Sequence, residues 1–193
     1  MTAPAQSTSV TVREARARYF AENGFDERGY ADRWVRLQAG PVPIYFPNTA
    51  ARVRSIRVHD VHHVVTGYAT TWTGEAEIGA WEIASGCADH AAAWVLNLMA
   101  MPIGLAIAPA ATFRAFGRGR HSANLYRRVI DDALLDRPVA ALAHELHLNE
   151  SAGRTTPGDV AAFVSWSIAA VATLLAVIGV TFSPIIAAVA LLV

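Results

Sequence analysis

The sequence predicts an all-α protein: a compact helical body followed by an apolar helical segment at the C-terminus. Apolar residues recur every three or four positions through most of the chain, as expected for amphipathic helices. No stretch shows a convincing alternation of apolar and polar residues, so no strand is predicted. Near the C-terminus, the stretch VAAFVSWSIAAVATLLAVIGV contains 21 residues and no charge.

Composition divides the chain into four parts. Residues 1–10 are rich in Ser, Thr and Ala, which predicts a flexible tail. Residues 11–148 form the predicted helical body, residues 149–159 (NESAGRTTPGD) a linker, and residues 160–193 the apolar C-terminal segment. A length of 193 residues suits one domain with such an appendage better than two full domains.

Within the body, glycine and proline residues separate the predicted helices. Gly40-Pro41 ends a first region, residues 11–38, that is predicted to hold one or two amphipathic helices. Gly67 ends the next helix, and Thr73-Gly74 opens the one after it. Prolines at 102 and 109 interrupt or kink the apolar stretch in which they lie. The later predicted helices cover residues 50–66, 75–100, 121–135 and 138–148.

The apolar C-terminal segment predicts membrane attachment. Its 21 uncharged residues would extend for about 30 Å as a helix, the thickness of a bilayer core. A single tail anchor and a hairpin that dips into the bilayer both fit, and so does a pair of buried helices. Arginines precede the segment, which favours a body at the inner face of the cytoplasmic membrane. Residues 91–111 are also apolar but contain Asn97 and two prolines, so they are a weaker candidate for membrane attachment.

The charge and cysteine content exclude several classes of function. Sixteen basic and sixteen acidic residues balance, so no charge-driven affinity for nucleic acid is expected. Every basic residue is arginine, which excludes Schiff-base chemistry on lysine. Cys87 is the single cysteine, so one chain can form neither a disulfide scaffold nor a thiolate zinc cluster. The N-terminus lacks the apolar core of a secretory signal, which predicts a cytosolic body.

Residues 59–75, HDVHHVVTGYATTWTGE, contain a cluster of metal-ligating residue types. On a helix, His59 and His63 are separated by four positions and share one face, and Asp60 borders that face. Paired histidines at this spacing hold zinc in helical metal sites. His62 lies about 100° around the helix axis from His63. It is therefore expected either to contact a metal ligand without binding the metal itself or to lie at the surface.

Glu75 is the predicted fourth ligand. Twelve residues after His63, it would be rotated by about 120° away from the histidine face on a continuous helix. A reversal at Gly67 would let a second, antiparallel helix return Glu75 to that face, forming a metal site on a helix-turn-helix. Two nitrogens and two carboxylates suit zinc and tolerate iron or manganese. The spacing alone is equally compatible with an ordinary surface or capping histidine pair.

The same stretch resembles the signature of the Coq-four family of coenzyme Q (ubiquinone) biosynthesis proteins. That signature is HDxxH, eleven residues and Glu, with T-G-aromatic after the second histidine and Gly before the Glu; here these are His59, Asp60, His63, Thr66, Gly67, Tyr68, Gly74 and Glu75. More loosely, Met101-Pro102 and residues 138–148 look like a turn and a closing helix of the family.

The resemblance implies a helical fold, a zinc ion and binding of a long isoprenoid. It also implies action on a polyprenylated hydroxybenzoate, removing the carboxyl group at ring carbon one, in some accounts with replacement by a hydroxyl. On this interpretation His59, Asp60, His63 and Glu75 are both metal ligands and catalytic residues. Implied partners are the polyprenylated aromatic or quinone precursor, membrane lipid, other quinone-biosynthesis proteins and a second copy of the chain.

Two other functions remain open from the sequence. The first is a non-catalytic scaffold that binds an isoprenoid or quinone intermediate, with zinc holding its helix pair together. The second is a membrane-anchored metal hydrolase or oxygenase. A second HxxH, His144 to His147, raises the class of membrane di-iron hydroxylases, but those sites need more histidines than the seven present.

Two further stretches are candidates for substrate contacts. FRAFGRGRHSANLYRR is rich in arginine and could hold a carboxylate or lipid phosphates, or it could be a solvated loop and helix start. Residues 85–113 could wall a tunnel for a prenyl chain, and ordinary core packing explains them equally well. The arginines predicted to contact an anion or headgroup are Arg114, Arg118, Arg120 and Arg127.

Overall fold

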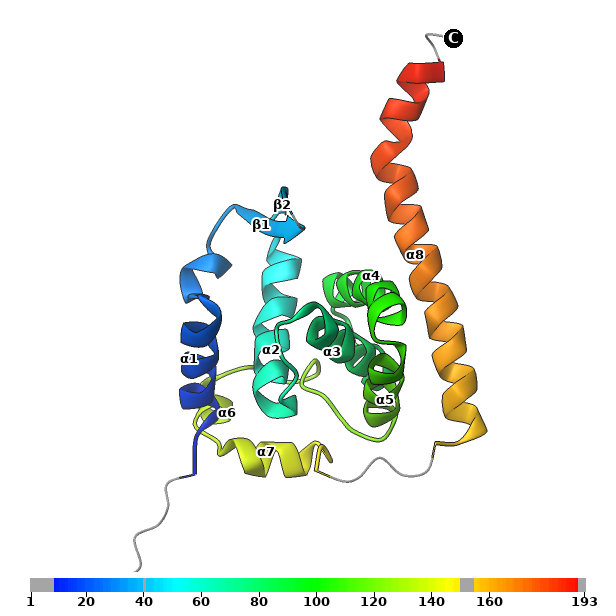
Figure 1. Ribbon diagram of the computed structural model, residues 1–193. Helices are drawn as coiled ribbons and strands as arrows, with labels where there is room; N and C mark the ends of the chain where they lie inside the picture. Colours follow the sequence, from blue (N-terminus) through cyan, green and yellow to red (C-terminus); the bar gives the residue numbers. More distant parts are fainter. Residues whose placement is uncertain (1–8, 40, 150–154, 191–193) are drawn as a thin grey trace, which may run out of the picture.

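A computed structural model describes residues 9–39, 41–149 and 155–190, and it is mostly helical (Figure 1). The predicted tail (1–10), linker (149–159) and C-terminal segment (160–193) therefore lie partly outside the described residues. The elements are, in chain order, α1 (Val12–Asn23), the 3₁₀ turn η1 (Glu27–Tyr30), β1 (Trp34–Ala39), β2 (Val42–Pro47), α2 (Ala50–Thr66), α3 (Trp72–Ser85), α4 (Ala91–Ile107), α5 (Pro109–Arg120), α6 (Asp132–Leu135), α7 (Val139–Glu145) and α8 (Pro157–Ala190).

A small β-hairpin corrects the prediction of a body without strands. Strands β1 and β2 pair antiparallel, with Trp34 opposite Pro47 and Ala39 opposite Val42. The predicted break at Gly40-Pro41 therefore separates two paired strands in the sequence and not two helices. Residues such as Val, Ile, Tyr, Phe and Trp favour strands, but the prolines at 43 and 47 hide the alternation in β2. Proline is tolerated there because both strands of a two-stranded sheet are edges.

Helix α2 has the predicted bounds because both of its ends are specified locally. The hydroxyl of Thr49 accepts a hydrogen bond from the backbone N–H of Arg52 at the N-terminus. At the other end Gly67 adopts φ 77°, a left-handed conformation that glycine reaches without strain. The helix therefore stops at Thr66, one turn after His63.

The predicted run 75–100 is two helices, α3 and α4. Gly86, with φ 88°, ends α3, and a short connection leads to the start of α4 at Ala91. Thr71 caps α3, so the helix begins three residues before Glu75 and not at Thr73-Gly74. Pro102 lies inside α4, and Pro109 opens α5.

Residues 121–135 and 138–148 form less helix than predicted. Only the short helices α6 and α7 are present, and residues 121–131 carry no regular structure. The backbone N–H of Leu125 donates instead to Nε2 of His62, 2.9 Å away on α2. A contact between residues 63 positions apart thus replaces the local helical bond that the periodicity predicted.

The core surrounds α3, which lies among α2, α4 and α5 (Figure 1). Its largest fully buried side chains include Trp81, Phe116, Ile78, Met101 and Leu142. The Trp81 indole N–H donates to the Ser122 hydroxyl at 2.8 Å, so burial leaves no unpaired polar group on that ring. Helix α3, which supplies one predicted ligand, is thus held at the centre of the body.

Helices α3 and α5 approach so closely at Gly119 that a side chain does not fit. A Cβ at this position would lie 2.4 Å from the carbonyl oxygen of Trp81 and 2.8 Å from the Cβ of Ala84. We therefore expect Gly119→Ala to lower the free energy of unfolding by about 1–3 kcal/mol. Urea denaturation of the detergent-solubilised protein measures the change.

Gly117, two residues earlier on α5, provides the control. A Cβ there meets nothing within 4 Å. Gly117→Ala should stabilise the protein by about 0.5–1 kcal/mol, because alanine is the better helix former. Equal effects of the two substitutions would show that the close approach of α3 and α5 is unimportant for stability.

Helix α8 is one continuous helix of 34 residues, so the chain does not form the predicted hairpin in this segment. It starts at Pro157, inside the predicted linker, and its first half lies against α4 and α5. Trp166 stacks on Trp94 with ring centroids 5.2 Å apart, and Ala170 is fully buried. Phe163 contacts two further aromatic rings, Phe113 and Phe116.

Beyond Ala170 the helix leaves the body and rises alone to the C-terminal end (orange to red in Figure 1). Residues 171–190 correspond to about 30 Å of helix, the thickness of a bilayer core. Within the described residues, Pro157–Ser183 is the one helix segment long and apolar enough to cross a membrane. Of its most apolar 18-residue stretch, 6% is buried. Large apolar side chains exposed on the free part are Val171, Leu175, Ile178, Val180 and Phe182.

Candidate metal centre

Three predicted ligands converge where α2 meets the start of α3. The Nε2 atoms of His59 and His63 lie 3.1 Å apart. Each Glu75 carboxylate oxygen lies 3.4 Å from one of these nitrogens. One ligand atom from each of the three residues falls within 4.8 Å of the others, so the group could hold a metal ion.

The turn between α2 and α3 positions Glu75. In Figure 1 α2 stands upright whereas α3 is seen nearly along its axis, so the helices cross and do not run antiparallel as predicted. Glu75 lies in the first turn of α3, at the crossing. Gly74 is needed there because a Cβ would lie 2.0 Å from the carbonyl oxygen of Ala69. The motif glycine before the glutamate thus lets the connecting loop lie directly on the helix backbone.

Hydrogen bonds behind the two histidines determine which nitrogens face the site. Nδ1 of His63 lies 2.8 Å from the carbonyl oxygen of Tyr68, which can only accept, so Nδ1 carries a proton. Nδ1 of His59 likewise donates to the carboxylate of Glu82 at 3.0 Å. Both Nε2 lone pairs therefore point at the same place as the Glu75 carboxylate. Such outer acceptors orient histidine ligands in metal sites.

Glu82 is the centre of a buried polar network that the sequence did not predict. Its side chain is fully buried and accepts four hydrogen bonds, from His59 (3.0 Å), His62 (2.6 Å), Asn97 (2.5 Å) and Tyr126 (2.7 Å). Burial alone would raise its pKa, but His59 and His62 hold the pKa of Glu82 well below its usual range. A charged carboxylate thus lies directly behind the metal-binding face.

His62 belongs to this network and is not a surface residue. It donates from Nδ1 to Glu82 and accepts at Nε2 from the backbone N–H of Leu125, so it holds one neutral tautomer. Burial lowers the pKa of His62 and opposes any charge on the ring. Its predicted angle of about 100° from His63 was informative, because it directs the ring into the core.

Asp60, the remaining predicted ligand, is not part of the cluster. Its carboxylate accepts a hydrogen bond from the Tyr30 hydroxyl, on η1. Burial raises the pKa of Asp60 above the ordinary aspartate value, although the bond from Tyr30 opposes the shift. Tyr19 of α1 stacks on His63 with ring centroids 5.3 Å apart. The N-terminal segment thus supplies two aromatic side chains that no local sequence signal connects to this site.

A proton and a metal ion would compete for Nε2 of His59. Burial alone would lower the pKa of His59, but the carboxylates of Glu82 and Glu75 outweigh burial and raise it well above the ordinary value. The two histidines in turn lower the pKa of Glu75 to about 2, against the opposing effect of burial. A metal ion must displace the proton on His59, so its affinity rises with pH.

Two imidazoles and one carboxylate form a donor set that zinc and iron(II) sites share. The side chain of Glu75 is 38% exposed, whereas that of His63 is 1% exposed. The cluster is therefore closed on the α2 side and open at Glu75. An open position of this kind distinguishes catalytic from structural zinc sites.

The arginines predicted to bind an anion have different surroundings. Arg118 donates to the carbonyl oxygens of Thr66 and Leu148 and lies over the Tyr68 ring, so it ties three segments together. Arg120 pairs with Asp159 at the start of α8. Arg114 and Arg127 are exposed and form no ion pair with another described residue, so their anion contact stays a prediction.

Neither of the other sequence candidates extends the cluster. His144 and His147 are exposed on and after α7, and neither is part of the three-residue group. The apolar stretch 85–113 forms α4 and the start of α5, and its Trp94 stacks on α8. Trp94 therefore contributes to packing of the body against α8.

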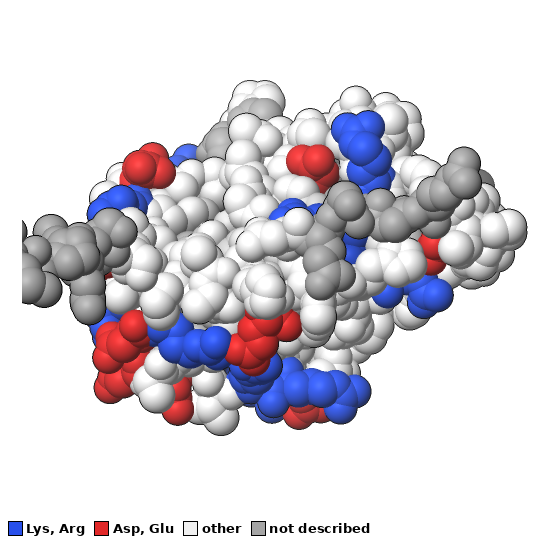
Figure 2. All heavy atoms as spheres, turned by 90° about the horizontal axis from the view of Figure 1, so that it is seen from below, with Lys and Arg blue, Asp and Glu red and all other residues white. Residues whose placement is uncertain are grey.

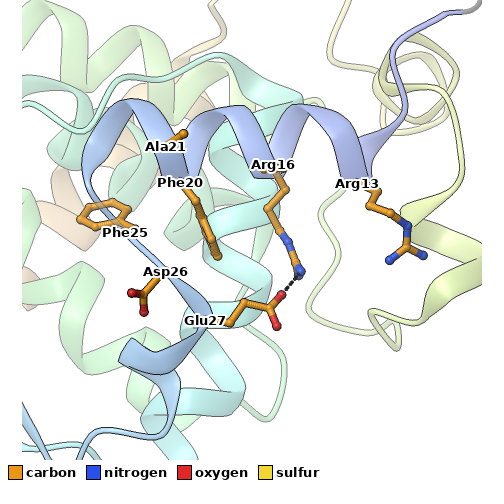
Figure 3. Close-up of a pocket in the computed structure, with 8 residues that line it drawn as sticks. Arg13, Arg16, Phe20, Ala21, Phe25, Asp26 and Glu27 are labelled. Atoms are coloured by element: carbon orange, nitrogen blue, oxygen red, sulfur yellow. Dashed lines mark hydrogen bonds and ion pairs between the residues drawn. The ribbon is translucent and has the colours of Figure 1, made fainter.

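A separate groove lies between α1 and the segment that follows it, residues 25–27 (Figure 3). Its volume is about 470 Å³, and Phe20 and Phe25 form its apolar part. Arg16 and Glu27 form an ion pair across it. None of its lining residues belongs to the histidine–glutamate cluster.

No protein-family model, no curated protein and no solved structure matches this chain. The geometry of the histidine–glutamate cluster and the resemblance of residues 59–75 are therefore the observations that bear on function.

Proposed function

We propose that this protein is a membrane-anchored, metal-dependent lyase that removes the ring-carbon-one carboxyl group of a polyprenylated hydroxybenzoate. One observation carries the proposal: two histidine lone pairs, fixed by Glu82 and Tyr68, converge with the Glu75 carboxylate. The resemblance of residues 59–75 to the Coq-four signature supplies the substrate class. Zinc is the metal that this donor set and the resemblance favour together.

The bound zinc would supply Lewis acidity for charge that develops on the substrate. The chain's own residues would do the rest. The open side at Glu75 admits the substrate, and burial raises the pKa of Asp60, the direction that a proton donor requires. When the bond between the ring and the carboxyl carbon breaks, carbon dioxide leaves and the electron pair stays on the ring. The proton of Asp60 then passes to that ring carbon, with Tyr30 orienting the carboxyl group.

The free part of α8 supports a location at the membrane. A polyprenyl chain dissolves in lipid, so an enzyme that acts on its aromatic end must work at the bilayer surface. A helix of about 30 Å beyond the body would keep the protein there. The body would lie at the inner face of the cytoplasmic membrane, as the arginines before the segment favour.

Substitution of Glu75 tests the proposal. Glu75→Gln keeps the shape of the side chain but removes its charge, so we expect zinc affinity to fall more than about 100-fold and turnover to be lost. Bound metal is measured by mass spectrometry of the purified protein, and turnover by loss of a polyprenylated hydroxybenzoate. Glu77→Gln, on the same helix but outside the cluster, is the matched control and should change neither.

The same experiment distinguishes an enzyme from a scaffold. Zinc that only joins α2 to α3 would make folding depend on the ion, so Glu75→Gln would unfold the body together with the loss of metal. A folded Glu75→Gln protein without turnover supports the lyase. A wild-type protein that binds no metal from the cell or in titration contradicts both functions.

A further inference from the structure

The β-hairpin exposes large apolar side chains in a pattern that core packing does not explain. Trp34 is 55% exposed, Tyr45 59% and Ile44 47%. In the register of the hairpin Arg36 lies opposite Tyr45 and Trp34 opposite Pro47, so Trp34, Arg36 and Tyr45 share one face, whereas Ile44 lies on the other face. The hairpin is thus exposed on both faces at Ile44 and Tyr45. Tryptophan, tyrosine and arginine together are typical of surfaces at the membrane–water interface.

The segment that holds the hairpin and the start of α2 is basic. Residues 33–57 contain five arginines and no acidic residue: Arg33, Arg36, Arg52, Arg54 and Arg57. Arg54 pairs with Asp89, which lies outside this segment. Two of them lie over aromatic rings, Arg52 over Phe46 and Arg57 over Tyr30. The opposite end of the molecule differs, because acidic and basic side chains are interspersed there (Figure 2). A cationic surface of this kind complements the phosphates of anionic lipids.

The hairpin lies at the same end of the body as the free part of α8 (Figure 1). A bilayer entered by the free helix therefore faces β1, β2 and the start of α2. One helix alone would leave the body free to tilt, whereas a second contact would orient it.

We propose that the β1–β2 hairpin and the first turns of α2 form a second membrane contact that binds anionic lipid headgroups. The inference rests on the membrane location proposed above, but it is independent of the metal and of the reaction. It places the N-terminus of α2 at the lipid surface. His59 is nine residues after Ala50 on α2, so the histidine–glutamate cluster lies about 14 Å from that surface.

A spin label at Ile44 tests this contact in the full-length protein. Cys87, the single native cysteine, is fully buried, so Ile44→Cys introduces one accessible thiol. Val129→Cys is the matched control, because Val129 is 77% exposed and precedes α6, which lies at the opposite end of the body from the hairpin (Figure 1). The protein is reconstituted into vesicles that contain anionic phospholipid, and power-saturation electron paramagnetic resonance compares access of oxygen and of a water-soluble nickel complex.

We expect the label at 44 to be accessible to oxygen and shielded from nickel, with the reverse for the label at 129. Trp34→Ser combined with Tyr45→Ser, or zwitterionic vesicles, should shift the label at 44 toward the aqueous pattern. Equal nickel access at 44 and 129 in anionic vesicles overturns the inference. Unchanged depth in zwitterionic vesicles overturns the headgroup preference.

Metal content and alkaline extraction of the same samples separate this inference from the proposed function. An aqueous label at 44, with metal bound and α8 resistant to extraction, contradicts the hairpin contact alone. Extraction of the protein by alkali contradicts the membrane anchor, and with it the premise of the second contact.

Discussion

Replacing Glu82 by leucine should lower the free energy of unfolding by about 3–5 kcal/mol. The substitution leaves His59, His62, Asn97 and Tyr126 without the acceptor that all four share. These donors lie in the core, where water cannot replace the lost bonds, and an unsatisfied buried group costs about 1–3 kcal/mol. Urea denaturation measures the change. Glu77→Leu, on the same helix but partly exposed, should shift stability far less.

The milder Glu82→Gln separates stability from metal binding. It keeps the size of the side chain but removes the charge behind His59. Its amide N–H₂ group is a donor and cannot accept a hydrogen bond from the donors around it. Zinc affinity should fall by about 10–100-fold, the effect typical of outer partners of metal-bound histidines. Calorimetric titration of the folded variant checks this. Wild-type stability of Glu82→Leu, or wild-type affinity of Glu82→Gln, would contradict a central role for this carboxylate.

The sequence predicts the convergence of the histidine–glutamate cluster best where the signal is local. His59 and His63 are four residues apart on a helix whose ends are specified by Thr49 and Gly67, so their shared face follows from helix geometry. The prediction that Glu75 joins them depended on the turn at Gly67 and on the family resemblance. The crossing of α2 and α3 could not be predicted, because spacing does not determine the angle between two helices.

The remaining parts of the site depend on contacts between distant residues. Glu82 lies 20 and 23 residues from its two histidines, and Tyr30 lies 30 residues from Asp60. One local signal was present: Glu82 follows Glu75 by seven residues, two helical turns, on a helix that is otherwise rich in apolar residues. A charge repeated at that period on an apolar helix indicates a buried polar stripe.

The structure differs from the sequence-based prediction where proline or a tertiary contact overrides periodicity. Pro43 and Pro47 hide the alternation of β2, so periodicity does not predict the hairpin. Residues 121–131 have helical periodicity, but the bond from Leu125 to His62 holds their backbone in another conformation. The buried network around Glu82 thus determines local structure far along the chain.

The two halves of α8 should respond to truncation in opposite ways. A chain that ends at residue 172 keeps the contacts of Phe163, Trp166 and Ala170 with the body, and loses only the free part of the helix. We expect it to be soluble without detergent, folded and able to bind metal. Metal content and thermal denaturation of the purified protein measure this result, and sedimentation with lipid vesicles measures the loss of membrane attachment.

A chain that ends at residue 156 should instead be destabilised, because it uncovers Trp94, Phe113 and Phe116 and removes Asp159 from Arg120. Trp166→Ala in the full-length chain isolates the largest of these contacts and should cost about 3 kcal/mol. If both truncated chains were equally stable and soluble, the first half of α8 would contribute nothing to the folded body. Lower stability of the shorter chain alone shows that the first half of α8 belongs to the body, so the proposed anchor begins beyond Ala170.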